Sequence, residues 1–150
     1  MKWGVAMYNR ILVPIEDLDT VDTVMPAVQS ISGKQTGCRV TLLHVVKPVY
    51  NLGVGPGYVV DVGDVEERLD EEGQQILEAA RHKFLASGLD AKIVLTSGEP
   101  AHEICRYADD DDTDLIIVGC KDKGLLEKLL IGSVSQKVTQ DAPSNVLVVK

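Results

Sequence analysis

The stretch from Gly119 to Ser135 has the clearest capacity for chemistry, because it joins a buried apolar run to a helical pattern. Gly119 ends the apolar run, and its missing Cβ would let a ligand approach the backbone. Gly132 and Ser133 open the helical pattern, where free amides, a hydroxyl and the positive end of the helix dipole suit a phosphate. Cations outnumber acids between these two ends: the side chains there include Lys121, Asp122, Lys123, Glu127 and Lys128. This pattern indicates a site for an anion.

The same residues also fit a purely structural interpretation. Gly119 would then end a strand, Gly132 and Ser133 would cap a helix, and the lysines would be solvated. Neither G-x-x-x-x-G-K-[ST] nor a G-x-G-x-x-G after the first apolar run occurs in the chain. An ordinary P-loop and an ordinary dinucleotide-binding turn are therefore excluded. On the residues alone, an anion site and a structural role both stay open.

Five short apolar runs could position this stretch as strands, and segments with helical periodicity separate them. The predicted strands are Arg10–Ile15, Arg39–Val46, Ala91–Thr96, Asp114–Gly119 and Asn145–Val149. The predicted helices occupy 17–33, 64–88, 100–109 and 132–141, and a long connection runs from Pro48 to Gly63. Nearly continuous apolar strands alternating with helices are typical of a parallel sheet covered on both faces. The fold class is therefore α/β, and ligands of such sheets bind at the carboxyl ends of the strands.

The composition limits the function further. A chain of 150 residues with 45% hydrophobic residues fits one domain with a sizeable core. The formal charge of −8 disfavours nucleic acid as a partner. Three cysteines without a C-x-x-C pair, and three separated histidines, predict reduced thiols and no metal site. No apolar run approaches the roughly 18 residues of a membrane span and no export signal is evident, so we expect a cytoplasmic protein.

Five motifs together resemble the universal stress protein family. They are Ile11–Pro14, Leu42–Val45, Gly98–Ile104, Thr113–Gly119 and Leu130–Ser135. The resemblance covers residues 10–150 and leaves residues 1–9 as an N-terminal extension. It implies a Rossmann-like fold of the adenine nucleotide alpha hydrolase-like type, with a five-stranded parallel sheet in the order 3-2-1-4-5. The switch point of that sheet lies between the strands that end at Ile15 and Gly119.

Relatives of this family that bind ATP carry G-x-x-G, nine residues, then G and Ser or Thr. On this chain the pattern falls on Gly119, Asp122, Gly132 and Ser133, so Asp122 replaces the second glycine. An unscreened like charge about 5 Å from a phosphate costs on the order of 3 kcal/mol at an effective dielectric constant near 20. Asp122 would weaken binding on that basis, whereas a carboxylate pointing to solvent or holding a magnesium ion would not.

The resemblance also implies roles for residues outside this motif. Pro14, Ile15 and Glu16 would line the base pocket, with Glu16 in place of the usual Asp. Val45 and Val118 would sandwich the adenine, although any parallel sheet would bury them. The phosphate contacts would come from the loop and the last helix, namely from Lys121, Lys123, Gly132, Ser133, Val134 and Ser135.

These features predict an ATP-binding regulatory protein of the stress response that is a homodimer through the edge strand Asn145–Val149. The ligand would be ATP, with or without magnesium. No catalytic constellation is apparent, so slow ATP hydrolysis is the most that an enzymatic role would include. The alternative is a dimeric, stress-related interaction module that has lost ATP binding, for which Asp122 is the main support. A substrate-adenylating ligase would need a Gly- and Ser-rich loop where this chain has Glu16–Thr20.

Overall fold

The computed structural model describes residues 8–33, 37–49, 62–120 and 132–150. Strands and helices alternate strictly along this part of the chain. In order, they are β1 (Arg10–Pro14), α1 (Leu18–Ser32), β2 (Arg39–Val46), α2 (Val62–Ala86), β3 (Ala91–Ser97), α3 (Pro100–Asp110), β4 (Leu115–Gly119), α4 (Ser133–Asp141) and β5 (Asn145–Val149). This alternation confirms the predicted α/β class.

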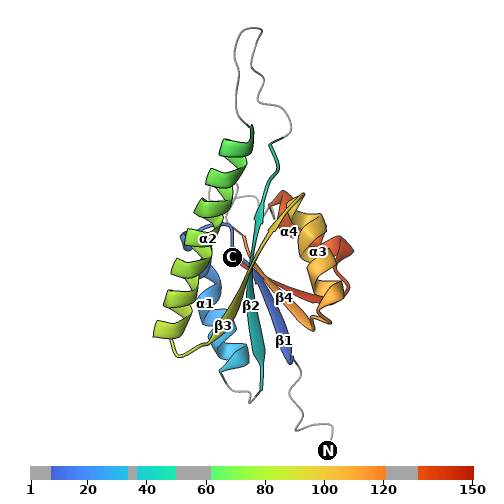
Figure 1. Cartoon of the computed structure of the whole chain (residues 1–150). Coiled ribbons are helices and arrows are strands. Elements are labelled where there is room, and N and C mark those ends of the chain that lie inside the picture. The colour runs from blue at the N-terminus through green and yellow to red at the C-terminus, as the bar shows by residue number, and fades with distance from the viewer. Residues whose placement is uncertain (1–7, 34–36, 50–61, 121–131) are drawn as a thin grey trace, which may run out of the picture.

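The strands form one sheet in the order β3-β2-β1-β4-β5, and every neighbouring pair is parallel. Figure 1 shows α1 and α2 on one face of this sheet and α3 and α4 on the other. The predicted order 3-2-1-4-5, with helices on both faces, is therefore confirmed. Because all strands are parallel, their carboxyl ends lie on the same side of the sheet.

The central strand β1 shows why its sequence is continuously apolar. Ile11 and Val13 pack into the core on the side of α1 and α2, whereas Leu12 packs into the core on the side of α3 and α4. All three side chains are buried. Successive residues of a strand point to opposite faces, so a strand covered on both faces needs an apolar residue at each position. The strand β4 follows the same rule.

Local signals for helix ends are also fulfilled. Asp17 caps α1, because its Oδ1 accepts a hydrogen bond of 3.0 Å from the backbone N–H of Thr20. Glu99 caps α3 by accepting from the N–H of His102 at 2.8 Å, and this bond lowers the pKa of Glu99. Gly88, with φ +83°, follows the end of α2 in the left-handed region that glycine adopts readily.

A few predicted boundaries were wrong by one or two residues. The apolar run Arg10–Ile15 ends as a strand at Pro14, the residue expected to mark its end, whereas α2 begins at Val62 rather than Asp64. β4 begins after Asp114, whose carboxylate instead accepts hydrogen bonds from the N–H groups of Asn9 and Arg10 at 2.8 and 2.9 Å. Most of the predicted connection from Pro48 to Gly63, and most of the predicted N-terminal extension, lie outside the described residues.

None of the three cysteines, all of which the structure describes, forms a disulfide. Burial raises the pKa of the thiols of Cys38 and Cys105, which keeps both protonated near neutral pH. In the described part of the chain, no helix combines the length and the apolar character that crossing a membrane requires.

Candidate functional site

A pocket opens at the carboxyl ends of β1, β2 and β4, and its cavity volume is about 130 Å³. Helices α3 and α4 contribute residues from one side and α1 contributes Thr20. The lining residues are Pro14, Ile15, Glu16, Thr20, Leu43, His44, Val45, Lys47, Pro100, Ile104, Val118, Gly119, Val134 and Ser135.

The sheet order explains where this pocket forms. The chain leaves β1 for β2 on one side, and β4 pairs with β1 on the other side. Connections that depart in opposite directions leave a crevice above the two neighbouring strands, where ligands of open α/β sheets bind. Ile15, just after β1, and Gly119, at the end of β4, both line this crevice.

Eight of the site residues predicted from the sequence come together in this pocket. They are Pro14, Ile15, Glu16, Val45, Val118, Gly119, Val134 and Ser135. Gly132 and Ser133 do not line it: Gly132 is the N-cap of α4, and Ser133 is its exposed first residue. Lys121, Asp122 and Lys123 lie outside the described residues.

Gly119 also lies close to α1, which the sequence did not indicate. A Cβ at this position would lie 3.3 Å from Cγ2 of Thr20 and 3.4 Å from Cγ1 of Val24, both on α1. The missing side chain therefore allows α1 to pack closely against the end of β4. Gly119 also lines the pocket, so the expected access to its backbone is compatible with this packing.

The amino end of α4 is another wall of the pocket. Its N-cap residue, Gly132, makes no side-chain hydrogen bond to the first amides of the helix. These amides can therefore bind another partner. Ser135 is buried and its hydroxyl lies 3.5 Å from the carbonyl oxygen of Gly119, a long contact for a hydrogen bond. A helix end of this kind favours negatively charged groups.

Sequence reasoning missed six residues that line the pocket. They are Thr20, Leu43, His44, Lys47, Pro100 and Ile104. Leu43 and Ile104 are buried core residues, and no local pattern separates them from other core residues. His44 offered a usable signal, because it is a polar side chain between the apolar pairs Leu42–Leu43 and Val45–Val46 of the strand.

His44 connects β2 to the end of β1 and to α2. Its Nδ1 lies 2.7 Å from the carbonyl oxygen of Ile15, so Nδ1 carries the proton and donates to that oxygen. On its other side the ring packs under Gly73 of α2, where a Cβ would lie 2.8 Å from Cδ2 of His44. His44 thus holds the backbone of a pocket residue in place.

The arrangement combines an apolar floor with a small set of polar groups at the rim. Val45, Val118 and Ile104 supply apolar surface, and Glu16 and Lys47 supply exposed charges. Among the described residues, no three His, Cys, Asp or Glu side chains gather closely enough to hold a metal ion. The pocket is suited to bind a partly apolar, partly charged small molecule.

Comparisons with known proteins agree with this architecture. The family model described as "Universal stress protein family" matches residues 7–150. Universal stress protein YxiE of Bacillus subtilis is 31% identical over 149 residues, which cover 96% of this chain and all of that protein. The solved structure of universal stress protein UspA from Lactobacillus plantarum is 27% identical, with a TM-score of 0.74, and the match covers 97% of this chain and 100% of the other.

Two further solved structures of this fold are described as nucleotide complexes. One is a universal stress protein in complex with cAMP, with a TM-score of 0.67 and 23% identity over 96% of this chain and 98% of the other. The other is the universal stress protein from Archaeoglobus fulgidus in complex with dAMP, with a TM-score of 0.65 and 22% identity over 96% of this chain and 99% of the other.

Proposed function

Because this chain belongs to the universal stress protein family, we propose that it is a regulatory protein of the stress response that binds an adenine nucleotide, ATP included. The observation that carries the proposal is the convergence of eight predicted residues on one pocket at the switch point of the sheet. The two nucleotide complexes of the same fold support the choice of an adenine nucleotide.

The proposed binding mode follows from the polarity of the pocket walls. The base would lie on the apolar surface of Val45 and Val118, and Glu16 would accept hydrogen bonds from ribose hydroxyls or the base. The phosphates would lie at the amino end of α4, near the amides of Val134 and Ser135. Gly132 and Ser133, together with Lys121 and Lys123, would complete the phosphate contacts, and Asp122 would point to solvent or hold a magnesium ion carried by the nucleotide.

The deciding experiment is a calorimetric titration of nucleotide-free protein with ATP, with and without magnesium. A dissociation constant near or below about 10 μM, equivalent to roughly 7 kcal/mol, would support the proposal. An absence of heat at millimolar ATP and AMP, repeated at a second temperature, would contradict it. The difference between the two titrations tests whether magnesium takes part.

We expect Glu16→Gln to weaken ATP binding about tenfold. The substitution removes the charge of an exposed pocket carboxylate, and hydrogen bonds to charged groups contribute about 1.5–3 kcal/mol. Asp90→Asn is the matched control, because it neutralises an exposed carboxylate just before β3. Asp90 lies at the amino end of its strand, whereas the pocket lies at the carboxyl ends. Equal affinities for the Glu16 variant and the control, measured by the same titration, would remove Glu16 from the site.

The second candidate function is a dimeric interaction module without ATP binding, and one feature of the sheet supports its dimeric state. β5 is an edge strand that pairs with β4 alone, and its side chains from Val146 to Val149 are half-exposed. The opposite edge strand, β3, carries the exposed Lys92. A charged residue protects an edge from pairing, whereas a half-exposed apolar edge is usually covered by a partner.

We therefore expect a homodimer formed through Asn145–Val149 under either function. Light scattering should give twice the mass of the 16.3 kDa chain at micromolar concentration. A monomer at every concentration tested would contradict pairing through β5. Since both candidate functions predict the dimer, the nucleotide titration distinguishes them.

A further inference from the structure

The polar side chains of the pocket divide into two groups. This division points to a residue that selects the ligand, an inference that rests on the proposed function. Three of them already bond to acceptors within the protein. Thr20 donates to Oδ1 of Asp17 at 3.0 Å, and His44 donates to the carbonyl of Ile15 at 2.7 Å. The hydroxyl of Ser135 is directed at the carbonyl of Gly119 at 3.5 Å.

Glu16 and Lys47 form the second group. Both are exposed, and neither makes a hydrogen bond or an ion pair with any residue that the structure describes. Glu16 follows β1 and Lys47 follows β2, so the two charges lie on neighbouring strand ends of the same pocket. Glu16 can only accept hydrogen bonds and Lys47 can only donate them. Among the described lining residues, Lys47 is the one lysine or arginine.

Lys47 also lines a second cavity, of about 120 Å³, beside the first. The other residues around this cavity are Val46, Pro48, Glu66, Leu69, Asp70 and Ser97. Glu66 and Asp70 lie in the first turns of α2 and are exposed. Neither forms an ion pair with Lys47 within 4.0 Å among the described residues. Lys47 therefore lines both the ligand pocket and a second cavity that two carboxylates also line.

This placement decides how the pocket treats a negative ligand. The chain carries a formal charge of −8, and two of its carboxylates, Glu66 and Asp70, lie beside Lys47 around the second cavity. A phosphate that enters is repelled by these groups, and the repulsion acts over the distances of a small pocket. A flexible ammonium at the rim offsets it for a phosphorylated ligand and gives an uncharged ligand almost nothing.

We propose that Lys47 is the specificity-determining residue that makes this pocket prefer nucleotides over nucleosides, and that Glu66 and Asp70 limit the preference by competing for its ammonium. The selected chemistry is a nucleoside that carries at least one phosphate. Lys47 follows β2, across β1 from β4, so it would act on the phosphate through space and in addition to the contacts at the amino end of α4.

The test compares AMP with adenosine, which differ by the phosphate alone, on Lys47→Met and on Lys92→Met as the matched control. Lys92 is an exposed lysine near the start of β3, where it pairs with Thr41 of β2. It therefore lies toward the amino ends of the strands, away from the pocket at their carboxyl ends. We expect Lys47→Met to weaken AMP binding about tenfold and adenosine binding less than twofold, with the control unchanged. Equal weakening of both ligands would assign Lys47 a packing role and overturn the proposal, as would unchanged binding of AMP.

A second arm tests the competing carboxylates. The double variant Glu66→Gln, Asp70→Asn should tighten AMP binding about threefold in the wild-type background and by clearly less when Lys47 is Met, where only the direct repulsion between these carboxylates and the phosphate is removed. The same tightening in both backgrounds would show general repulsion and overturn the competition. Adenosine binding to the wild-type protein also distinguishes the role of Lys47 from the proposed nucleotide binding. Wild-type protein that binds adenosine and AMP equally overturns the role of Lys47 alone, whereas protein that binds neither overturns the proposed function as well.

Discussion

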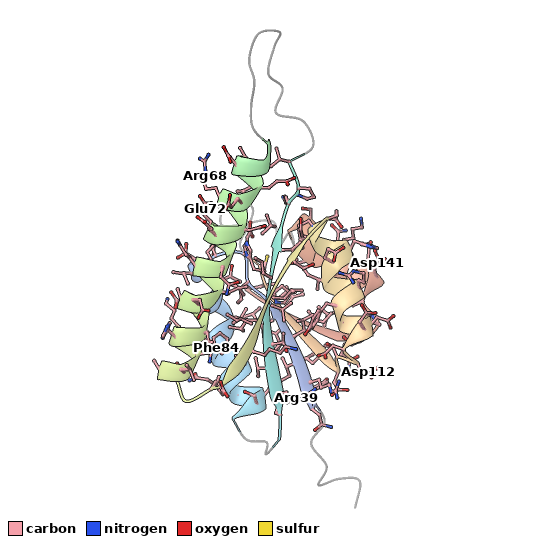
Figure 2. All side chains as sticks on the ribbon, viewed as in Figure 1. Arg39, Arg68, Glu72, Phe84, Asp112 and Asp141 are labelled. Carbon is pink, nitrogen blue, oxygen red and sulfur yellow. The ribbon has the colours of Figure 1, made fainter. Side chains whose placement is uncertain are left out.

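Phe84→Ala is expected to lower the free energy of unfolding by about 4 kcal/mol, the largest effect of any substitution considered for this protein. Phe84 lies on α2, and Figure 2 shows it on the side of the helix that faces the sheet. Its side chain is 0% exposed and belongs to the core between the sheet and helices α1 and α2. Removing the ring loses its burial and leaves a cavity that a close-packed core fills poorly.

The measurement is urea unfolding followed by far-UV circular dichroism. Leu85→Ala is the matched control, because Leu85 is the next residue of the same helix and is 45% exposed. We expect the control to change stability by less than about 1 kcal/mol. Similar losses for Phe84 and Leu85 would contradict the packing of α2 on the sheet. Domains are typically stable by about 5–15 kcal/mol, so the Phe84 variant would retain only a small margin.

The sheet was predictable from the sequence because its central strands are buried on both faces. Runs such as Arg10–Pro14 and Leu115–Gly119 have no room for alternating polar residues, and this makes them recognisable. The strand order was less accessible. It depends on which neighbours each strand pairs with, and no local pattern specifies that; the order came from the resemblance to the family and was confirmed by the sheet.

The helices show the limit of local patterns. The helical spacing of Leu69, Gly73, Ile76, Ala80 and Phe84 predicts that these residues share one face of α2. Ala80 and Phe84 are fully buried, but so is Leu77, which this spacing leaves out. Gly73 appeared as one more small residue on the same face. Its close approach to His44 and Leu95 became visible only when the helix and the sheet were placed together.

Some residues of the candidate site could also be predicted from local patterns, and others could not. Residues that end strands or begin helices, such as Ile15, Gly119 and Val134, could be predicted because motifs mark those positions. Thr20 and Pro100 could not be, since they reach the pocket through the packing of α1 and α3 over the edge of the sheet. Lys47 follows an apolar strand as an ordinary exposed lysine, and only the two cavities beside it distinguish it.

Gly73→Val is the second prediction with a large effect, because it tests the contact between α2 and the pocket. A Cβ at Gly73 would lie 2.8 Å from both Cδ2 of His44 and Cδ1 of Leu95, so a branched side chain cannot fit without displacing them. Valine suits a helix better than glycine by a few tenths of a kcal/mol, whereas overpacking a core costs about 1–3 kcal/mol. The steric term dominates, and we expect a net loss of about 2 kcal/mol in the free energy of unfolding.

The same variant should weaken nucleotide binding, because His44 cannot move without releasing the carbonyl of Ile15. Gln75→Val, at an exposed position of the same helix, controls for the substitution itself and should leave binding unchanged. Urea unfolding and AMP titration of Gly73→Val with His44 intact and with His44→Ala then locate the clash. If the imidazole is the obstacle, the added valine costs clearly less stability once the ring is gone. An equal cost in both backgrounds would place the obstacle at Leu95, and binding would then be unaffected by the valine because the hydrogen bond to Ile15 would be undisturbed.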